Sequence, residues 1–186
     1  MEAMAKRGIT AATVSRAVGS GDVERLSRGT YRSPRASAVG CSDLALVAAR
    51  APRGVVCLLS AAGLHGLGDV IPDEVWLAIP NNGRPPRIEW PRVRTVRWRS
   101  PAALTLGVED RVMSGVTVMV TNPARTVLDM LRMRSTVGED RALEALRDFA
   151  AGNGSIPEVR AIAGRFGVGR AVAPYLNAFS HMGTRS

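Results

Sequence analysis

The sequence predicts a mixed α/β protein of the α+β class, with a small N-terminal helix–hairpin unit, a mixed-sheet domain and C-terminal helices. Three observations lead to this prediction. Residues 1–35 contain a short helical pattern and then two β-prone runs. Residues 55–80 contain two apolar runs and a helical pattern with almost no charge, and residues beyond 122 carry apolar side chains at helical spacing. We therefore expect one unit over residues 1–35 and a larger domain over residues 41–180.

Length and composition limit the class of protein. A chain of 186 residues with 46% hydrophobic residues can form one packed domain with a small appendage. It contains no apolar run near the roughly 20 residues that span a bilayer, and no apolar segment follows Lys6 and Arg7 as in a secretory signal. Cys57 lies in an apolar run and is expected to be a small buried hydrophobe. We expect a cytoplasmic protein that does not enter a membrane.

The charge is strongly positive. There are 25 basic and 16 acidic residues, a formal net charge of +9. Lys6 is the single lysine, and all other basic residues are arginine. A GC-rich genome would account for the preference for arginine over lysine, but not for the excess of basic over acidic residues. A basic surface favours a polyanionic partner, and nucleic acid is preferred to a membrane because no amphipathic basic helix is present.

The first 35 residues show the order of a recognition helix and a wing. A helix capped by Thr10 and ending near Ser20 would carry apolar residues on one face and small polar residues on the other. Two β-prone runs then flank Ser27-Arg28-Gly29, a hairpin signal. Seven basic and three acidic residues lie in this segment. These features predict a partial winged helix-turn-helix that contacts DNA. The expected DNA-binding residues are Lys6, Arg7, Thr10, Thr13, Arg16, Ser20, Arg25, Arg28, Tyr31 and Arg32. The alternative is a helix and hairpin packed on the main domain, with solvated arginines.

The apolar stretch over residues 55–80 is expected to form the centre of the larger domain. Residues 55–59 read as a buried strand, Ser60 as the cap of a short helix ending at Gly66 or Gly68, and residues 75–79 as a second strand. His65 has no acidic or cysteine neighbour at ligand spacing, so we expect a hydrogen-bonded core histidine rather than a metal ligand.

The remaining elements follow from local signals. We expect a linker over residues 34–40 and a helix over 43–51 capped by Ser42. Further strands are expected over 93–98, 108–113 and 116–121, with Ser114-Gly115 as a tight turn. Asn122-Pro123 begins a helix to about residue 132, and later helices are expected over 138–150, 155–166 and 171–179.

A second arginine-rich segment follows the central stretch. Between residues 84 and 99 there are six arginines and a single acid, Glu89. They are Arg84, Arg87, Arg92, Arg94, Arg97 and Arg99. The segment is either a second phosphate-contacting surface or a solvated sheet edge protected from aggregation by its charge.

Sequence motifs for catalysis are largely absent. The chain has no Walker A motif, no dinucleotide-binding glycine motif, no CxxC and no HExxH, so we expect neither a cofactor nor a metal. A dyad of Cys57 and His65 would lack an orienting acid. A nuclease could use Asp73, Glu74 and Glu89, but no lysine lies near them. We therefore expect that the protein is not an enzyme, with a nuclease as the catalytic alternative.

Three sequence blocks resemble the AbiEi family, the antitoxins and transcriptional regulators of type IV toxin–antitoxin, abortive-infection systems. The blocks are RLSRGTYRSP at 25–34, VVCLLSAAGLHGLGDVIPDEVWLAIP at 55–80 and TNPARTVLDMLRMRSTVGEDRALEALRD at 121–148. The resemblance extends over about residues 7–178. It implies a winged helix that represses the protein's own operon by binding promoter repeats in double-stranded DNA. It also implies an antitoxin domain that counters a nucleotidyltransferase-like toxin without a stable complex.

By position, the resemblance makes residues 10–20 the recognition helix and residues 25–32 the wing. Within the antitoxin domain it places several motifs that we interpret as structural: Ser60-Ala61, His65-Gly66-Leu67, Pro123, Arg125-Thr126 and Asp129. Only nine residues precede Thr10, fewer than a complete winged helix needs, so either a supporting helix is missing or the start codon lies upstream. An antitoxin or protein-interaction domain with a vestigial DNA-binding segment is thus the alternative function.

Overall fold

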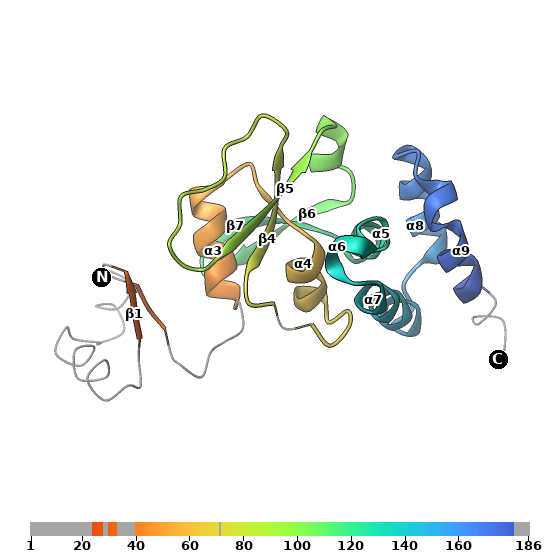
Figure 1. The fold of residues 1–186 in the computed structure, drawn as a ribbon, viewed down its shortest axis with the longest axis horizontal. Coiled ribbons are helices and arrows are strands. Elements are labelled where there is room, and N and C mark those ends of the chain that lie inside the picture. Colours follow the sequence, from red (N-terminus) through yellow and green to blue (C-terminus); the bar gives the residue numbers. More distant parts are fainter. Residues whose placement is uncertain (1–23, 28–29, 33–39, 71, 181–186) are drawn as a thin grey trace.

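A five-stranded mixed sheet, covered by helices on both faces, forms the body of the protein (Figure 1). The computed structural model describes residues 24–27, 30–32, 40–70 and 72–180. The α+β class predicted from the sequence is confirmed. The described helices are α3 (Cys41–Arg50), α4 (Leu58–His65), the 3₁₀ helix η1 (Pro101–Leu104), α5 (Pro123–Arg132), α6 (Arg134–Val137), α7 (Glu139–Ala151), α8 (Ile156–Arg165) and α9 (Gly169–Ser180). The strands are β1 (Glu24–Ser27), β2 (Thr30–Arg32), β3 (Val55–Val56), β4 (Val75–Pro80), β5 (Val93–Trp98), β6 (Val108–Met113) and β7 (Val116–Thr121).

The strand order of the sheet is β5-β4-β3-β7-β6. β4 runs parallel to β5 and antiparallel to β3, while β3 is parallel to β7 and β7 antiparallel to β6. β4 is buried along almost its whole length, which explains its uninterrupted apolar sequence. β5 and β6 are the two edges, and their side chains are mostly partly buried or exposed, with a buried residue, Trp98 or Met113, at the end of each strand.

Alternation along the strands divides the core into two clusters. Val75, Leu77 and Ile79 of β4 pack with α3 on one face of the sheet. Trp76 and Ala78 point to the other face, where α4, α5 and η1 lie. α7 packs against α5, and α8 and α9 form the outer layer on that side (Figure 1). None of the helices in the described part of the chain is long and apolar enough to cross a membrane.

Several predicted elements are confirmed with their bounds. The strands 93–98, 108–113 and 116–121 begin and end where expected, and the turn between the last two has Ser114 at φ 49° and Gly115 at φ 79°. Two positive φ angles are the geometry of a tight hairpin turn, which glycine favours. Asn122 caps α5 as predicted, because its side-chain oxygen accepts a hydrogen bond from the Arg125 amide at 2.8 Å.

Two predicted caps and one predicted strand are wrong. The strand expected over 55–59 ends at Val56, and Leu58 and Leu59 begin α4 with Cys57 as the N-cap. Ser60 lies inside that helix, and its hydroxyl bonds the backbone of Trp76 in β4 and of Glu74 just before it. Gly40, not Ser42, caps α3, and its amide donates to the Asp43 carboxylate at 3.0 Å. Gly66 ends α4 at φ 65°, as expected. η1 and α6 were not predicted.

Candidate nucleic-acid interface

The hairpin predicted as a wing is present in the described residues. β1 and β2 pair antiparallel, with Arg25 opposite Tyr31 and Glu24 opposite Arg32, and a bulge between Arg25 and Ser27. A bulge increases the local twist of a hairpin. Three expected DNA-binding residues, Arg25, Tyr31 and Arg32, therefore lie on paired strands. The predicted helix over 10–20, most of the linker, and the other expected contacts (Lys6, Arg7, Thr10, Thr13, Arg16, Ser20 and Arg28) lie outside the described residues.

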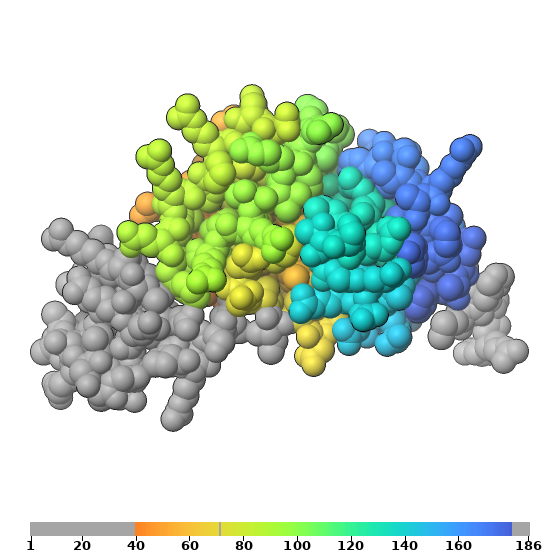
Figure 2. All heavy atoms as spheres, in the orientation of Figure 1, coloured from red at the N-terminus to blue at the C-terminus, as the bar shows by residue number. Residues whose placement is uncertain are grey.

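The six arginines of the second basic segment are all exposed, and side chains of this yellow-green segment project from the surface in Figure 2, but the six are not equivalent. Arg94 on β5 forms an ion pair with Glu74 at 3.2 Å and stacks on the ring of Trp76, its register partner on β4, at 4.5 Å from the centroid. Arg97 donates to the carbonyl oxygens of Asn81 and Gly83 at 2.7 and 2.8 Å. These two guanidinium groups hold the sheet edge and the loop after β4.

The guanidinium groups of the other four arginines of this segment have no ion pair or hydrogen bond to another described residue. These arginines are Arg84, Arg87, Arg92 and Arg99. Their donors are available to solvent or to an anion. The structure therefore separates the predicted basic surface into a structural pair and four unengaged cations.

Two adjacent hollows lie where β4 ends. The first has a volume of about 520 Å³, and its lining includes Arg50, Arg53 and Arg84. The second has a volume of about 680 Å³, and its lining includes Arg53, Arg99 and Trp98. Both hollows share Arg53, Pro80 and Asn82. Arg50 and Arg53 carry no sequence signal beyond their charge. They lie at the end of α3 and in the turn that follows it, and they reach the loop after β4 only in the folded chain.

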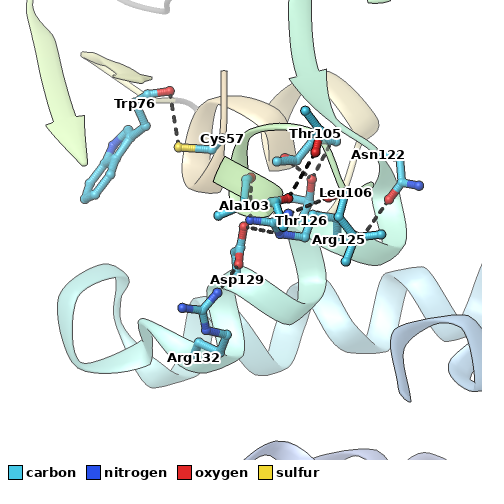
Figure 3. A network of polar contacts seen from close by, with 12 residues as sticks. Cys57, Trp76, Ala103, Thr105, Leu106, Asn122, Arg125, Thr126, Asp129 and Arg132 are labelled. Atoms are coloured by element: carbon cyan, nitrogen blue, oxygen red, sulfur yellow. Dashed lines mark hydrogen bonds and ion pairs between the residues drawn. The ribbon is translucent and has the colours of Figure 1, made fainter. Parts of the chain in front are cut away.

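A buried ionic network surrounds Arg125 on α5 (Figure 3). Its guanidinium group is fully buried and forms an ion pair with Asp129 at 2.8 Å. The same group donates to the carbonyl oxygens of Ala103, at 3.1 Å, and Leu106. Arg132 contacts the second carboxylate oxygen of Asp129 at 2.9 Å. Burial lowers the pKa of Arg125 and raises that of Asp129, while the attraction between the two charges opposes both changes.

Aromatic rings complete this network. The Arg125 guanidinium lies 4.5 Å from the centroid of the Trp98 ring on β5 and 4.3 Å from that of Phe166 at the end of α8. The network thus joins the sheet, η1, α5 and α8 at one point. Because Arg125 is inaccessible and its contacts are all within the chain, these residues organise the fold rather than bind a ligand.

His65 and Cys57 each have a different partner, so they do not form a dyad with one another. His65 Nε2 donates to the Thr121 carbonyl at 2.6 Å, and Nδ1 lies 3.4 Å from Nη2 of Arg111. Burial lowers the pKa of His65, and the nearby Arg111 charge lowers it further. The Cys57 thiol contacts the Trp76 carbonyl at 3.7 Å, and burial raises its pKa. Cys57 is thus a buried core residue, as its sequence context indicated, whereas His65 is hydrogen-bonded but only partly buried.

The acidic residues considered for a nuclease do not form a cluster in the structure. Glu74 is paired with Arg94. Among residues 24–27, 30–32, 40–70 and 72–180, no group of three or more His, Cys, Asp or Glu side chains is placed to hold a metal ion. The described geometry therefore offers no support for metal-assisted cleavage by Asp73, Glu74 and Glu89.

Comparison with known proteins supplies a family for the N-terminal segment. Residues 2–34 match a family model described as transcriptional regulator, AbiEi antitoxin. No curated protein matches the chain. The matched segment contains the β1–β2 hairpin and all the residues expected to contact DNA at the N-terminus. The resemblance drawn from the sequence is thus confirmed over this segment: residues 2–34 match the AbiEi family of antitoxin transcriptional regulators.

Proposed function

We propose that this protein is the antitoxin of a type IV toxin–antitoxin system and a DNA-binding autorepressor. It binds repeats in its own promoter as double-stranded DNA and counters a nucleotidyltransferase-like toxin without forming a stable complex. The observation that carries this proposal is the family match over residues 2–34, which includes the hairpin with Arg25 and Arg32. The net positive charge of the chain, +9, supports a nucleic-acid partner.

In this proposal the N-terminal unit has two kinds of contact. Side chains from residues 10–20, including Thr13 and Arg16, approach base edges in the major groove. Arg25, Arg28 and Arg32 of the hairpin contact phosphates, where a guanidinium group donates two parallel hydrogen bonds. Phosphate contacts set affinity and orientation, and base contacts set the sequence that is read.

The larger body acts by binding and is not an enzyme in this proposal. Its buried polar side chains, Arg125 and Asp129 among them, are bonded to other groups of the chain. The His65 ring and the Cys57 thiol are likewise engaged internally. These contacts support an antitoxin domain that presents a surface rather than reactive groups.

Salt-dependent DNA binding tests the regulator. Fluorescence anisotropy would compare a promoter duplex with a shuffled duplex of equal length over a range of salt concentrations. The Arg25→Ala/Arg28→Ala variant should flatten the plot of log affinity against log salt by about 1 to 2 units, as expected for two lost phosphate contacts. Arg147→Ala/Arg170→Ala removes the same charge from exposed positions on α7 and α9, and should leave the slope near that of the wild type. Equal affinity for both duplexes at physiological salt would overturn the regulator proposal.

A second candidate function is an antitoxin or interaction domain whose DNA-binding segment is vestigial. It is favoured by the extent of the described body, in which residues 40–70 and 72–180 contain a five-stranded sheet and both core clusters. Growth rescue from the toxin encoded alongside separates the two. If the wild type binds promoter and shuffled duplexes alike but still rescues growth, the second candidate holds. If it discriminates between them, the first does.

A further inference from the structure

The loop after β4 separates two hollows that are rich in arginine. The first hollow is lined by the end of α3, the turn that follows it and the loop after β4, including Arg50, Arg53 and Arg84. The second lies beside Trp98, Arg99 and Leu104. Together they contain four arginines and no acidic residue, and they share Arg53, Pro80 and Asn82. They adjoin the carboxyl ends of the parallel strands β4 and β5, the edge at which α/β sheets commonly bind ligands.

The charge in these hollows is not neutralised within the described part of the chain. The guanidinium groups of Arg50, Arg53, Arg84 and Arg99 have no ion pair or hydrogen bond to another described residue. The C-terminal end of α3, near Arg50, contributes a partial charge of about −0.5, which is small beside three full positive charges in the first hollow. The net charge of the first hollow is therefore positive, which favours the binding of an anion.

The walls of the hollows are held by hydrogen bonds. Arg97 on β5 fixes the loop between them through the carbonyl oxygens of Asn81 and Gly83. On the opposite side, the amide of Gly54 donates to the Ala51 carbonyl at 2.8 Å and closes the turn that carries Arg53. The turn also packs closely against Leu77 of β4, because a Cβ added at Gly54 would lie 2.9 Å from the Leu77 side chain. A site fixed in this way loses less conformational entropy when a ligand binds.

The two hollows differ in chemistry. The first is lined by three arginines, and guanidinium groups bind phosphate through paired hydrogen bonds. The second adds the apolar residues Leu104 and Met119 and the amide residue Asn81, groups that suit a heterocyclic base. The volumes of about 520 and 680 Å³ lie within the range of about 300 to 1,000 Å³ found for small-ligand sites. We infer that the body of the protein binds a nucleoside phosphate here, with the phosphates in the first hollow and the base in the second.

Isothermal titration calorimetry of the full chain at low salt tests this inference. The probes are the four ribonucleoside triphosphates, inorganic tripolyphosphate, the four unphosphorylated nucleosides and a single-stranded tetranucleotide. At least one triphosphate should bind, tripolyphosphate should bind about tenfold more weakly, and the nucleosides should give no heat. If the tetranucleotide binds more tightly than any triphosphate, the nucleoside phosphate that the site binds is part of a nucleic-acid strand. If it binds more weakly, the ligand is a free nucleotide.

Variants locate the site. Arg53→Ala and Arg84→Ala should each weaken triphosphate binding about tenfold, because each removes charged hydrogen bonds to phosphate. Arg147→Ala on α7 removes one exposed charge elsewhere and should have no effect. Circular dichroism of each variant would establish that it is folded.

Three results would overturn the inference. They are the absence of triphosphate binding at millimolar concentration, equal binding of tripolyphosphate, and equal losses in Arg53→Ala and Arg147→Ala. The Arg25→Ala/Arg28→Ala variant should retain triphosphate binding. The inference can therefore fail while promoter binding holds, or hold while promoter binding fails.

Discussion

Arg125 and Asp129 form a buried ion pair one helical turn apart on α5, with Nε and Oδ2 separated by 2.8 Å. The remaining guanidinium donors reach carbonyl oxygens of η1 and the loop that follows it. Trp98 and Phe166 stack on the same guanidinium group. A single side chain thus connects the sheet edge with the helical layer.

Removing one member of this pair should destabilise the protein severely. Arg125→Met leaves the Asp129 carboxylate buried with only Arg132 beside it, and leaves the Ala103 carbonyl without this donor. Breaking a buried ion pair in this way costs about 3–5 kcal/mol. Urea denaturation at neutral pH would measure the change in the free energy of unfolding.

Two further variants control for this effect. Arg132→Ala removes a partner whose side chain is 31% exposed, so its cost should be about 1 kcal/mol or less. Arg125→Met/Asp129→Leu removes both buried charges and should be less destabilised than the sum of the two single substitutions. A cost below about 1 kcal/mol for Arg125→Met would contradict the structural role of the pair.

Ser60 connects α4 to β4 through one hydroxyl group. Its Oγ accepts from the Trp76 amide at 2.9 Å and donates to the Glu74 carbonyl at 3.3 Å. Ser60→Ala leaves a buried amide unsatisfied, which should lower the free energy of unfolding by about 1–3 kcal/mol. Ser100→Ala, at an exposed position with no capping hydrogen bond, should change it by less than about 0.5 kcal/mol. Equal stabilities of the two variants in urea denaturation would contradict this role.

The depressed pKa of His65 predicts a loss of stability in mild acid. Burial and the Arg111 charge hold the folded-state pKa below the ordinary value of 6.5. Between these two pKa values the unfolded chain binds more protons, so the free energy of unfolding falls as the pH decreases through this interval. Denaturation at several pH values between about 7.5 and 5 would measure the slope, and His65→Gln should reduce it. The same slope in both proteins would show that His65 is not responsible.

Local signals explain why much of the body could be predicted. Ser114-Gly115 specifies a tight turn and Asn122-Pro123 specifies a helix start, since each depends on the conformational preferences of two adjacent residues. The apolar run at 55–59 was misjudged, because a short run of this kind is compatible with a buried strand or a buried helix. Packing assigned Leu58 and Leu59 to α4.

The sequence by itself determined the α+β class, most strand and helix bounds in the body, the basic character of the chain and the resemblance to AbiEi proteins. The tertiary structure decided which arginines are structural and which are free. It buried Arg125, paired Arg94 and Arg97 with the loop and strand beside them, and brought Arg53 close to Arg84 at one edge of the sheet. These pairings depend on contacts between segments distant in sequence, whereas turns and caps depend on neighbouring residues, whose preferences can be read directly.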